Sequence, residues 1–425
     1  MNKTADEASW LLRSGRIEEA EQAYMRVLAE DPFNLQALNI VALAAIRLGQ
    51  LHRAAELLDR AVSVAPGHAA SHHHRGRAAE LLGDLATARG LHERAVQLGA
   101  DLPAARLHLA AVLEQQGEHQ AALVQYARVM GDMQSRGRWL DAATTPPALV
   151  SLVAHAAQVV REGRRVLFYG VIEPLVREFG RSGLARIERM LRIYLKDEAA
   201  DYPDSRQRPT FLYFPGLPTT PWLEPGLFPG LDEAAARTAA IRAELESQLR
   251  ADRGSEQVFS STALAAENLR STREAPSWTG YYFYRHGVRR EDNCAACPVT
   301  SATLDALPLS RVGDHGPEVL FSVFTPGTHL LPHRGVTNTR VVAHLPLIVP
   351  PDCALAVGGE VHEWQEGRIV VFDDTYEHEA WNRSVRVRVV LIFDLWNPHL
   401  SELERAAVER LVVAIGDFRQ AREQA

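Results

Sequence analysis

Two histidines and an arginine in the last quarter of the chain are the residues whose types and spacing could do chemistry. His333 lies in the stretch Pro-Gly-Thr-His-Leu-Leu-Pro-His-Arg-Gly, His378 follows 45 residues later, and Arg388 comes ten residues after that. Imidazole nitrogens bind divalent transition metals, and a guanidinium binds a carboxylate through two parallel hydrogen bonds. This combination predicts an iron(II) centre that uses dioxygen and a carboxylated co-substrate, 2-oxoglutarate. The residue two after His333 is Gly335, so the carboxylate that usually completes such a centre is missing at that position.

The elements that must position these residues are short strands. From Trp278 onward, runs rich in β-branched and aromatic residues alternate with turn residues, and the clearest runs are 281–284, 319–325, 339–349, 368–372 and 385–393. Many short strands separated by Gly and Pro turns are typical of a sandwich or barrel. A double-stranded β-helix, or jelly roll, turns side chains of several strands toward one cavity, where positions 333 and 378 could meet.

An ordered set of motifs identifies a family. The motifs are Phe-Pro-Gly-Leu-Pro (214–218), Pro-Gly-Thr-His (326–329), Pro-His-Arg-Gly-Val-Thr-Asn (332–338), His-Leu-Pro-Leu (344–347), Trp-Gln-Glu-Gly (364–367), Phe-Asp-Asp (372–374), His-Glu-Ala-Trp (378–381) and Asp-Leu-Trp-Asn-Pro (394–398). From about Pro209 to Pro398 the chain resembles the aspartyl/asparaginyl β-hydroxylase family. Members of that family hydroxylate a β-carbon with iron, dioxygen and 2-oxoglutarate. They bind iron through two histidines without a carboxylate, so Gly335 fits the resemblance.

The resemblance also implies roles for individual residues. His333 and His378 would be the iron ligands, and no catalytic residue is expected beyond this metal centre. Arg388 would pair with the distal carboxylate of 2-oxoglutarate with the help of Ser322, and His344 would form a hydrogen bond to the same co-substrate.

One departure from the family concerns the substrate. The animal enzymes carry a second arginine two residues before the histidine that matches His344, and here that position is Val342. Arg340 is therefore the only arginine left in this stretch as a candidate substrate contact. The departure leaves the reaction class unchanged and the substrate open.

Several neighbouring residues compete for these roles. Arg386 would share one face of an alternating strand with Arg388, and the family spacing selects Arg388. Asp373 and Asp374 are candidates for the missing carboxylate ligand, but we expect them to cap a turn or to orient His378. We expect His329 to be structural.

Cysteines offer a second possible metal site. Cys294 and Cys297 have the spacing of half a zinc site, but the chain has only three cysteines and no second pair. A zinc site is therefore not expected.

The first 135 residues repeat with a period of 34. The series are Gly15, Gly49, Gly83 and Gly117; Ala20, Ala54, Ala88 and Ala122; Val27, Ala61, Ala95 and Val129; and Pro32 and Pro66. A glycine that ends one helix, small residues where helices cross, and a proline that ends the unit resemble the tetratricopeptide repeat. Such arrays bind a peptide or another protein, so we expect a protein or peptide partner. The run His72-His-His74 is expected on the surface or in the groove, because consecutive helical residues point in different directions.

These observations predict a multidomain protein of α and β parts. The predicted parts are four tetratricopeptide repeats (1–136), a helical connector (137–201), an aspartyl/asparaginyl β-hydroxylase-like jelly roll (202–400) and a C-terminal helix (401–425). Within the third part we expect extended chain and turns through the proline cluster 203–229, a helix over about 231–249, and a polar surface loop over 250–277 that covers the site.

Composition narrows the class of protein. The chain has 425 residues, of which 46% are hydrophobic and 23% charged, with a net charge of −7. This balance implies no nucleic-acid partner. Three cysteines suit a reducing compartment, and neither a signal peptide nor an apolar run long enough for a membrane span is found. We therefore expect a cytoplasmic enzyme.

Three hypotheses for function follow. The leading one is hydroxylation of the β-carbon of an Asp or Asn residue in a protein or peptide that the repeats present. The alternative keeps the chemistry and changes the substrate to a free amino acid, a small metabolite or a lipid acyl chain. A third, a non-catalytic repeat scaffold, is disfavoured because the set His333, His378 and Arg388 is complete.

Overall fold

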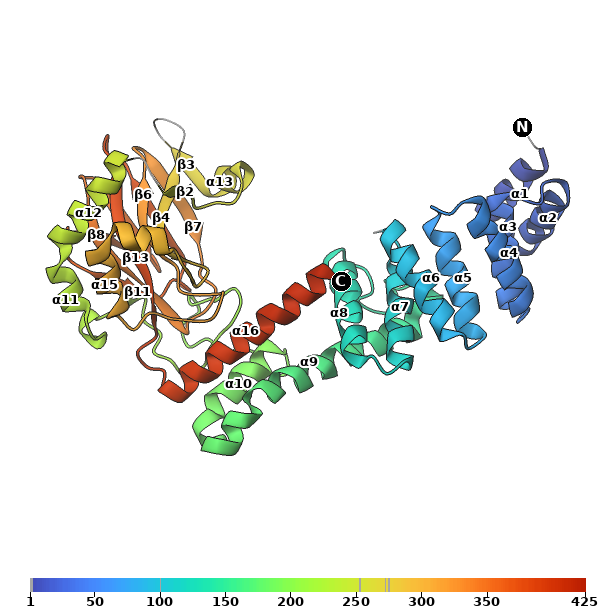
Figure 1. Ribbon diagram of the computed structural model, residues 1–425, viewed down its shortest axis with the longest axis horizontal. Coiled ribbons are helices and arrows are strands. Elements are labelled where there is room, and N and C mark those ends of the chain that lie inside the picture. The colour runs from blue at the N-terminus through green and yellow to red at the C-terminus, as the bar shows by residue number, and fades with distance from the viewer. Residues whose placement is uncertain (1–2, 100, 252–253, 272, 274–275) are drawn as a thin grey trace. The chain divides into compact units, whose positions relative to one another are not determined.

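The computed structural model describes residues 3–99, 101–251, 254–271, 273 and 276–425, which form two compact units (Figure 1). One unit comprises residues 1–164 with 418–425, and the other comprises residues 165–417. Helices α9 (Val150–Phe179) and α16 (Glu402–Gln424) contribute residues to both units, so the connector predicted as one segment is divided between them. None of the described helices has the length and apolar character needed to cross a membrane.

The first unit is built from paired helices. They are α1 (Lys3–Arg13), α2 (Ile17–Glu30), α3 (Leu35–Arg47), α4 (Leu51–Val64), α5 (Ala69–Leu81), α6 (Leu85–Leu98), α7 (Pro103–Gln115) and α8 (His119–Ser135). The four glycines of the 34-residue series all have φ between 72° and 81°, the left-handed conformation expected where the first helix of each pair ends. The four alanines of the second series are fully buried, which allows the helices to pack closely. The prediction of helical repeats is confirmed.

The histidine run does not lie on the surface as expected. His72 and His73 are buried, and the Nδ1 atom of His73 lies 3.3 Å from Nδ1 of His92. His92 and His108 in turn contact the two carboxylate oxygens of Glu80, at 3.1 and 3.3 Å. The surface alternative was wrong because α6 and α7 pack against α5 and bring these imidazoles into one buried polar cluster, which a periodicity argument within one helix cannot reveal. The groove alternative stays a prediction.

The second unit is an antiparallel β domain with two sheets. The larger sheet has the strand order β1-β11-β8-β13-β6-β4-β2, with β5 paired to β4, and the smaller has the order β10-β9-β12-β7-β3. The strands are β1 (Trp222–Leu223), β2 (Ser255–Gln257), β3 (Leu269–Ser271), β4 (Trp278–Arg285), β5 (Val288–Arg289), β6 (Val319–Phe324), β7 (Thr328–His333), β8 (Arg340–Ile348), β9 (Cys353–Val357), β10 (Glu360–Glu363), β11 (Val370–Phe372), β12 (His378–Asn382) and β13 (Arg388–Trp396).

Two cores flank the larger sheet. One core lies between the sheets, where Phe324, Val342 and Val390 of the larger sheet pack with Leu330 and Leu355 of the smaller. The other core is closed by helices α11 (Leu231–Ala236), α12 (Thr238–Ala251), α14 (Glu291–Ala296) and α15 (Pro298–Asp305). The two faces of the larger sheet are therefore different: one is sealed by helices and the other faces the smaller sheet.

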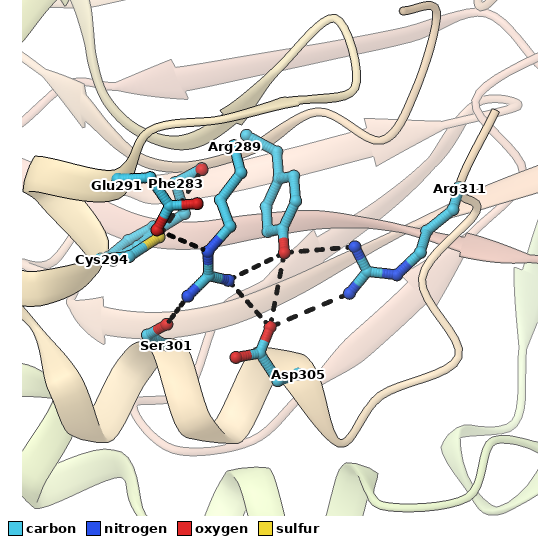
Figure 2. A network of polar contacts seen from close by, with 8 residues as sticks. Phe283, Arg289, Glu291, Cys294, Ser301, Asp305 and Arg311 are labelled. Atoms are coloured by element: carbon cyan, nitrogen blue, oxygen red, sulfur yellow. Dashed lines mark hydrogen bonds and ion pairs between the residues drawn. The ribbon is translucent and has the colours of Figure 1, made fainter. Parts of the chain in front are cut away.

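A polar network fastens α14 and α15 to the edge of the larger sheet (Figure 2). The guanidinium of Arg289 donates to Tyr284 Oη, Asp305 Oδ1 and Ser301 Oγ, each at 2.9 Å. Arg311 donates to the same tyrosine oxygen at 3.1 Å. Cys294 and Cys297 are buried free cysteines, and the thiol of Cys294 lies 3.8 Å from the carbonyl oxygen of Phe283.

Two predictions for the segment before β4 were wrong in part. The helix expected over 231–249 is interrupted at Arg237 and forms α11 and α12. The segment 250–277 was expected to be a loop, but it contains β2, β3 and helix α13 (Thr262–Asn268). Residues 252–253, 272 and 274–275 of that segment lie outside the described residues. Helix α10 (Ala185–Tyr194) lies within the predicted helical connector.

Candidate active site

Two neighbouring strands of the smaller sheet bring the histidines together. β12 pairs with β7 in antiparallel register so that His378 lies opposite His333, and the two ring centroids are 4.0 Å apart. Each Nδ1 lies within hydrogen-bond distance of a backbone carbonyl, that of Leu331 at 2.9 Å and that of Tyr376 at 3.1 Å. These contacts place the proton of each neutral ring on Nδ1 and leave the lone pair on Nε2 for a metal.

The charge state of His378 suits metal binding. Burial and the neighbouring His333 lower the pKa of His378 to about 4. The ring is therefore neutral at neutral pH, which is the form that binds a metal ion.

Gly335 has no room for a side chain. A Cβ at this position would lie 2.1 Å from Cγ of Asp374, so the carboxylate of Asp374 occupies the space where a residue-335 side chain would stand. Oδ2 of Asp374 pairs with Arg340 at 3.1 Å, and its Oδ1 is buried without a hydrogen-bond partner. Among the described residues no cluster of three His, Cys, Asp or Glu side chains has the geometry to hold a metal. In the described part of the chain, His333 and His378 therefore face each other without a third potential ligand side chain.

Arg388 is a buried cation without a counter-ion. It is 1% exposed, and no carboxylate of the described residues lies within ion-pair distance. Its guanidinium stacks on the rings of Phe324 at 3.7 Å and Trp364 at 4.8 Å, and Nη1 donates to Ser322 Oγ at 3.4 Å. Burial lowers the pKa of Arg388 to about 9, and Nε has no partner. A cation in this state favours an anionic ligand, because burying an unpaired charge is costly.

His344 is influenced by the charges of both Arg388 and His378. Burial, Arg388 and His378 lower its pKa well below the usual value, and its Nδ1 is buried without a partner. A neutral imidazole with an unused nitrogen can donate a hydrogen bond to a bound ligand.

One cavity of about 620 Å³ contains all six residues for which the sequence predicted a role. Its lining includes His333, His378, His344, Arg388, Ser322 and Arg340, together with Asp374 and Val342. The remaining wall is mostly apolar and comes from both sheets and from the segment that joins β2 to α13. Two aromatic residues near Arg388 were missed by the sequence analysis. Trp278 donates from Nε1 to Ser322 Oγ at 2.9 Å, and Trp364 covers the guanidinium.

The residues that were alternative candidates for these roles lie elsewhere or make other contacts. Arg386 is exposed and lies before β13, which begins at Arg388, so the two arginines do not share a strand face as we had expected. Oδ1 of Asp373 accepts hydrogen bonds from Thr375, in agreement with the expected turn cap. His329 pairs with Glu379 at 2.6 Å.

The donor set fits iron(II) and 2-oxoglutarate. Two imidazole ligands leave enough coordination positions for a bidentate ligand and dioxygen, and the buried guanidinium and the unpaired nitrogen of His344 suit the carboxylates of a dicarboxylate.

Comparison with known proteins identifies the family of the chain. A family model described as aspartyl/asparaginyl beta-hydroxylase matches residues 235–398, and a tetratricopeptide repeat model matches 6–69 and 42–103. The chain is 34% identical over 226 residues to the ornithine lipid ester-linked acyl 2-hydroxylase of Rhizobium tropici, which covers 52% of this chain and 75% of that protein. The chain belongs to the aspartyl/asparaginyl β-hydroxylase family.

Two human members of the family are also similar. Aspartate beta-hydroxylase domain-containing protein 2 is 31% identical over 255 residues, which is 58% of this chain and 66% of that protein. Aspartyl/asparaginyl beta-hydroxylase is 34% identical over 143 residues, or 33% of this chain and 18% of that protein. The chain thus spans less than two thirds of either human relative.

Proposed function

We propose that the chain is an iron(II)- and 2-oxoglutarate-dependent dioxygenase that hydroxylates a carbon atom of its substrate. The observation that carries this proposal is a single cavity that holds two facing imidazoles and a buried guanidinium without a counter-ion. Iron, when bound, would supply the activation of dioxygen coupled to the oxidation of 2-oxoglutarate to succinate.

The residues of the chain would bind and orient the reactants. His333 and His378 would offer Nε2 to the metal, each held by a backbone carbonyl at its Nδ1. Arg388 would bind the distal carboxylate of 2-oxoglutarate, with Ser322 fixed beside it by Trp278. His344 would donate a hydrogen bond to the co-substrate. The apolar wall would keep bulk water away from the reacting carbon.

The guanidinium of Arg340 is already paired with carboxylates of the chain, unlike that of an arginine that waits for a substrate. It forms ion pairs with Asp374 and with Asp394, the latter at 2.9 Å. Burial alone would lower its pKa, but these two carboxylates outweigh burial and raise it. We therefore assign Arg340 to holding Asp374 in place beside Gly335.

The substrate has two candidate classes. The family name favours the β-carbon of an Asp or Asn residue, which the repeats would present as part of a protein or peptide. The similarity to an acyl 2-hydroxylase favours a lipid acyl chain. Tetratricopeptide repeats suit a protein partner in either case, as a substrate or as an anchor.

The proposal is tested by the turnover of 2-oxoglutarate to succinate by the full chain. His378→Ala should abolish turnover, whereas His329→Gln, on the strand that carries His333 but outside the cavity, should retain it. Turnover that survives His378→Ala would refute the metal assignment. Mass spectrometry of host proteins and lipids, with the active chain and with His378→Ala, should find the substrate as a species with one added oxygen.

A further inference from the structure

The cavity has two ends whose charges differ. Arg388, Ile392 and Asp394 lie on the same face of β13 and all line the cavity. Six residues separate Arg388 from Asp394, which corresponds to roughly 20 Å along a strand. We call the part lined by Arg285, His286, Glu318, Arg340 and Asp394 the far end. If Arg388 binds the co-substrate, the far end and the wall that leads to it are left for the substrate.

Both guanidinium groups of the far end are already paired. Arg340 is held between Asp374 and Asp394, and Arg285 forms an ion pair with Glu256. The position at which the animal enzymes of the family carry a second arginine is Val342, which lies opposite Asp394 in the sheet. Among the described residues that line the far end, no arginine is therefore free to receive a carboxylate of a substrate.

Glu318 is the carboxylate of the far end that forms no close ion pair with an arginine or lysine of the described residues. Its Oε1 accepts a hydrogen bond from the backbone N–H of His286 at 2.6 Å and lies 2.8 Å from Nδ1 of the same residue. Arg285 and Arg340 act on this carboxylate only from beyond ion-pair distance, and they partly oppose the effect of burial on its pKa. Burial raises its pKa, although its side chain keeps 31% exposure and faces the cavity. A positive charge placed beside it would stabilise its ionised form.

The wall between the two ends is apolar. It is formed by Val258, Phe259, Leu264, Leu320, Val336, Val342 and Ile392. Leu264 and Val336 remain 42% and 44% exposed, so apolar surface continues to the mouth. A wall of this kind stabilises an extended hydrocarbon chain through burial of apolar surface.

We propose that the substrate is an amphiphile: an apolar chain that lies along this wall and carries a positively charged group that pairs with Glu318. The inference rests on the proposed function for the identity of the reacting centre, but it concerns recognition, which can be measured without iron. It disfavours an aspartyl side chain as the group that enters the cavity.

Calorimetric binding to the iron-free full chain in the presence of 2-oxoglutarate tests the inference. The three matched probes are N-(2-aminoethyl)decanamide, which is cationic, N-(2-hydroxyethyl)decanamide, which is neutral, and N-decanoylglycine, which is anionic. We expect the cationic probe to bind best and the anionic probe worst. Glu318→Gln should weaken the cationic probe about five- to tenfold, the range for a partly buried ion pair, and leave the neutral probe unchanged. Glu360→Gln, an exposed change on β10, is the control and should alter neither.

Results that contradict the amphiphile proposal can be told apart from results that contradict the oxygenase proposal. Equal or tighter binding of the anionic probe, no effect of Glu318→Gln, or no binding of any probe would overturn the amphiphile proposal while leaving the oxygenase proposal intact. Probe binding as expected in a protein that does not turn over 2-oxoglutarate would instead refute the proposed function.

Discussion

Replacement of the buried arginine should stabilise the protein while it removes co-substrate binding. Burial lowers the pKa of Arg388 to about 9, well below the ordinary value of an arginine. At about 1.36 kcal/mol per pKa unit, the folded state carries on the order of 5 kcal/mol of uncompensated cost for this charge at neutral pH. Both folded and unfolded states are protonated there, so the cost is present at every pH below the folded-state pKa. Arg388→Met keeps an apolar stem against Phe324 and Trp364 and removes the charge.

We expect Arg388→Met to raise the free energy of unfolding by about 1–4 kcal/mol, the range found when buried charges are replaced by apolar residues. The measurement is urea unfolding of the metal-free protein. In the unmutated chain, 2-oxoglutarate at about one hundred times its Kd should add about 2.7 kcal/mol, and in Arg388→Met it should add nothing. Arg386→Met, an exposed change two residues earlier, is the matched control and should change neither quantity.

The reasoning is refuted if Arg388→Met destabilises the protein while 2-oxoglutarate still protects it. That result would mean that Arg388 has a structural counter-ion and that the co-substrate binds elsewhere.

Three further predictions concern other parts of the molecule. Gly335→Ala should lower the free energy of unfolding by about 1–3 kcal/mol through the clash with Asp374, and the same change should cost much less in an Asp374→Ala background; additive losses in this double-mutant cycle would contradict the assigned contact. Burial lowers the pKa of His73 to about 2 and of His74 to about 4, so these folded-state values lie below the unfolded value of 6.5. Stability should therefore be full above about pH 6.5 and fall by up to ~1.4 kcal/mol per pH unit per histidine below it; a thermal unfolding temperature that is constant from pH 7 to 5 would be inconsistent with this. Val342→Arg should improve binding of N-decanoylglycine relative to the cationic probe, and unchanged selectivity in a folded variant would argue against an electrostatic origin.

Much of the fold could be predicted because its signals are local. The 34-residue period needs only one glycine with positive φ and one small residue per helix pair, and the structure has both at each expected position. Strands β4, β6, β8 and β13 were found because they are long and rich in β-branched and aromatic residues.

The strands that carry the histidines were not found from strand patterns. β7 reads Thr-His-Leu-Leu-Pro-His and β12 reads His-Glu-Ala-Trp-Asn, and neither has an unbroken apolar alternation. Their pairing, which brings His333 opposite His378, is a long-range contact that no local pattern encodes. The motif order of the family pointed to the residues, and the sheet supplies their register.

The sequence also could not predict which charged groups of the site are paired. The lack of a counter-ion for Arg388, the double pairing of Arg340 and the position of Glu318 facing the cavity depend on which residues from different strands meet. The buried histidine cluster of the repeats has the same origin, because its members come from three helices.

The most direct test of the central claim is an anaerobic titration of the full chain with iron(II) in the presence of 2-oxoglutarate, followed by visible absorption. A weak metal-to-ligand charge-transfer band should appear with saturation at one equivalent of iron. The band should be absent in His378→Ala and should require excess co-substrate in Arg388→Met. A folded chain that gives no band at saturating iron and 2-oxoglutarate would contradict the account.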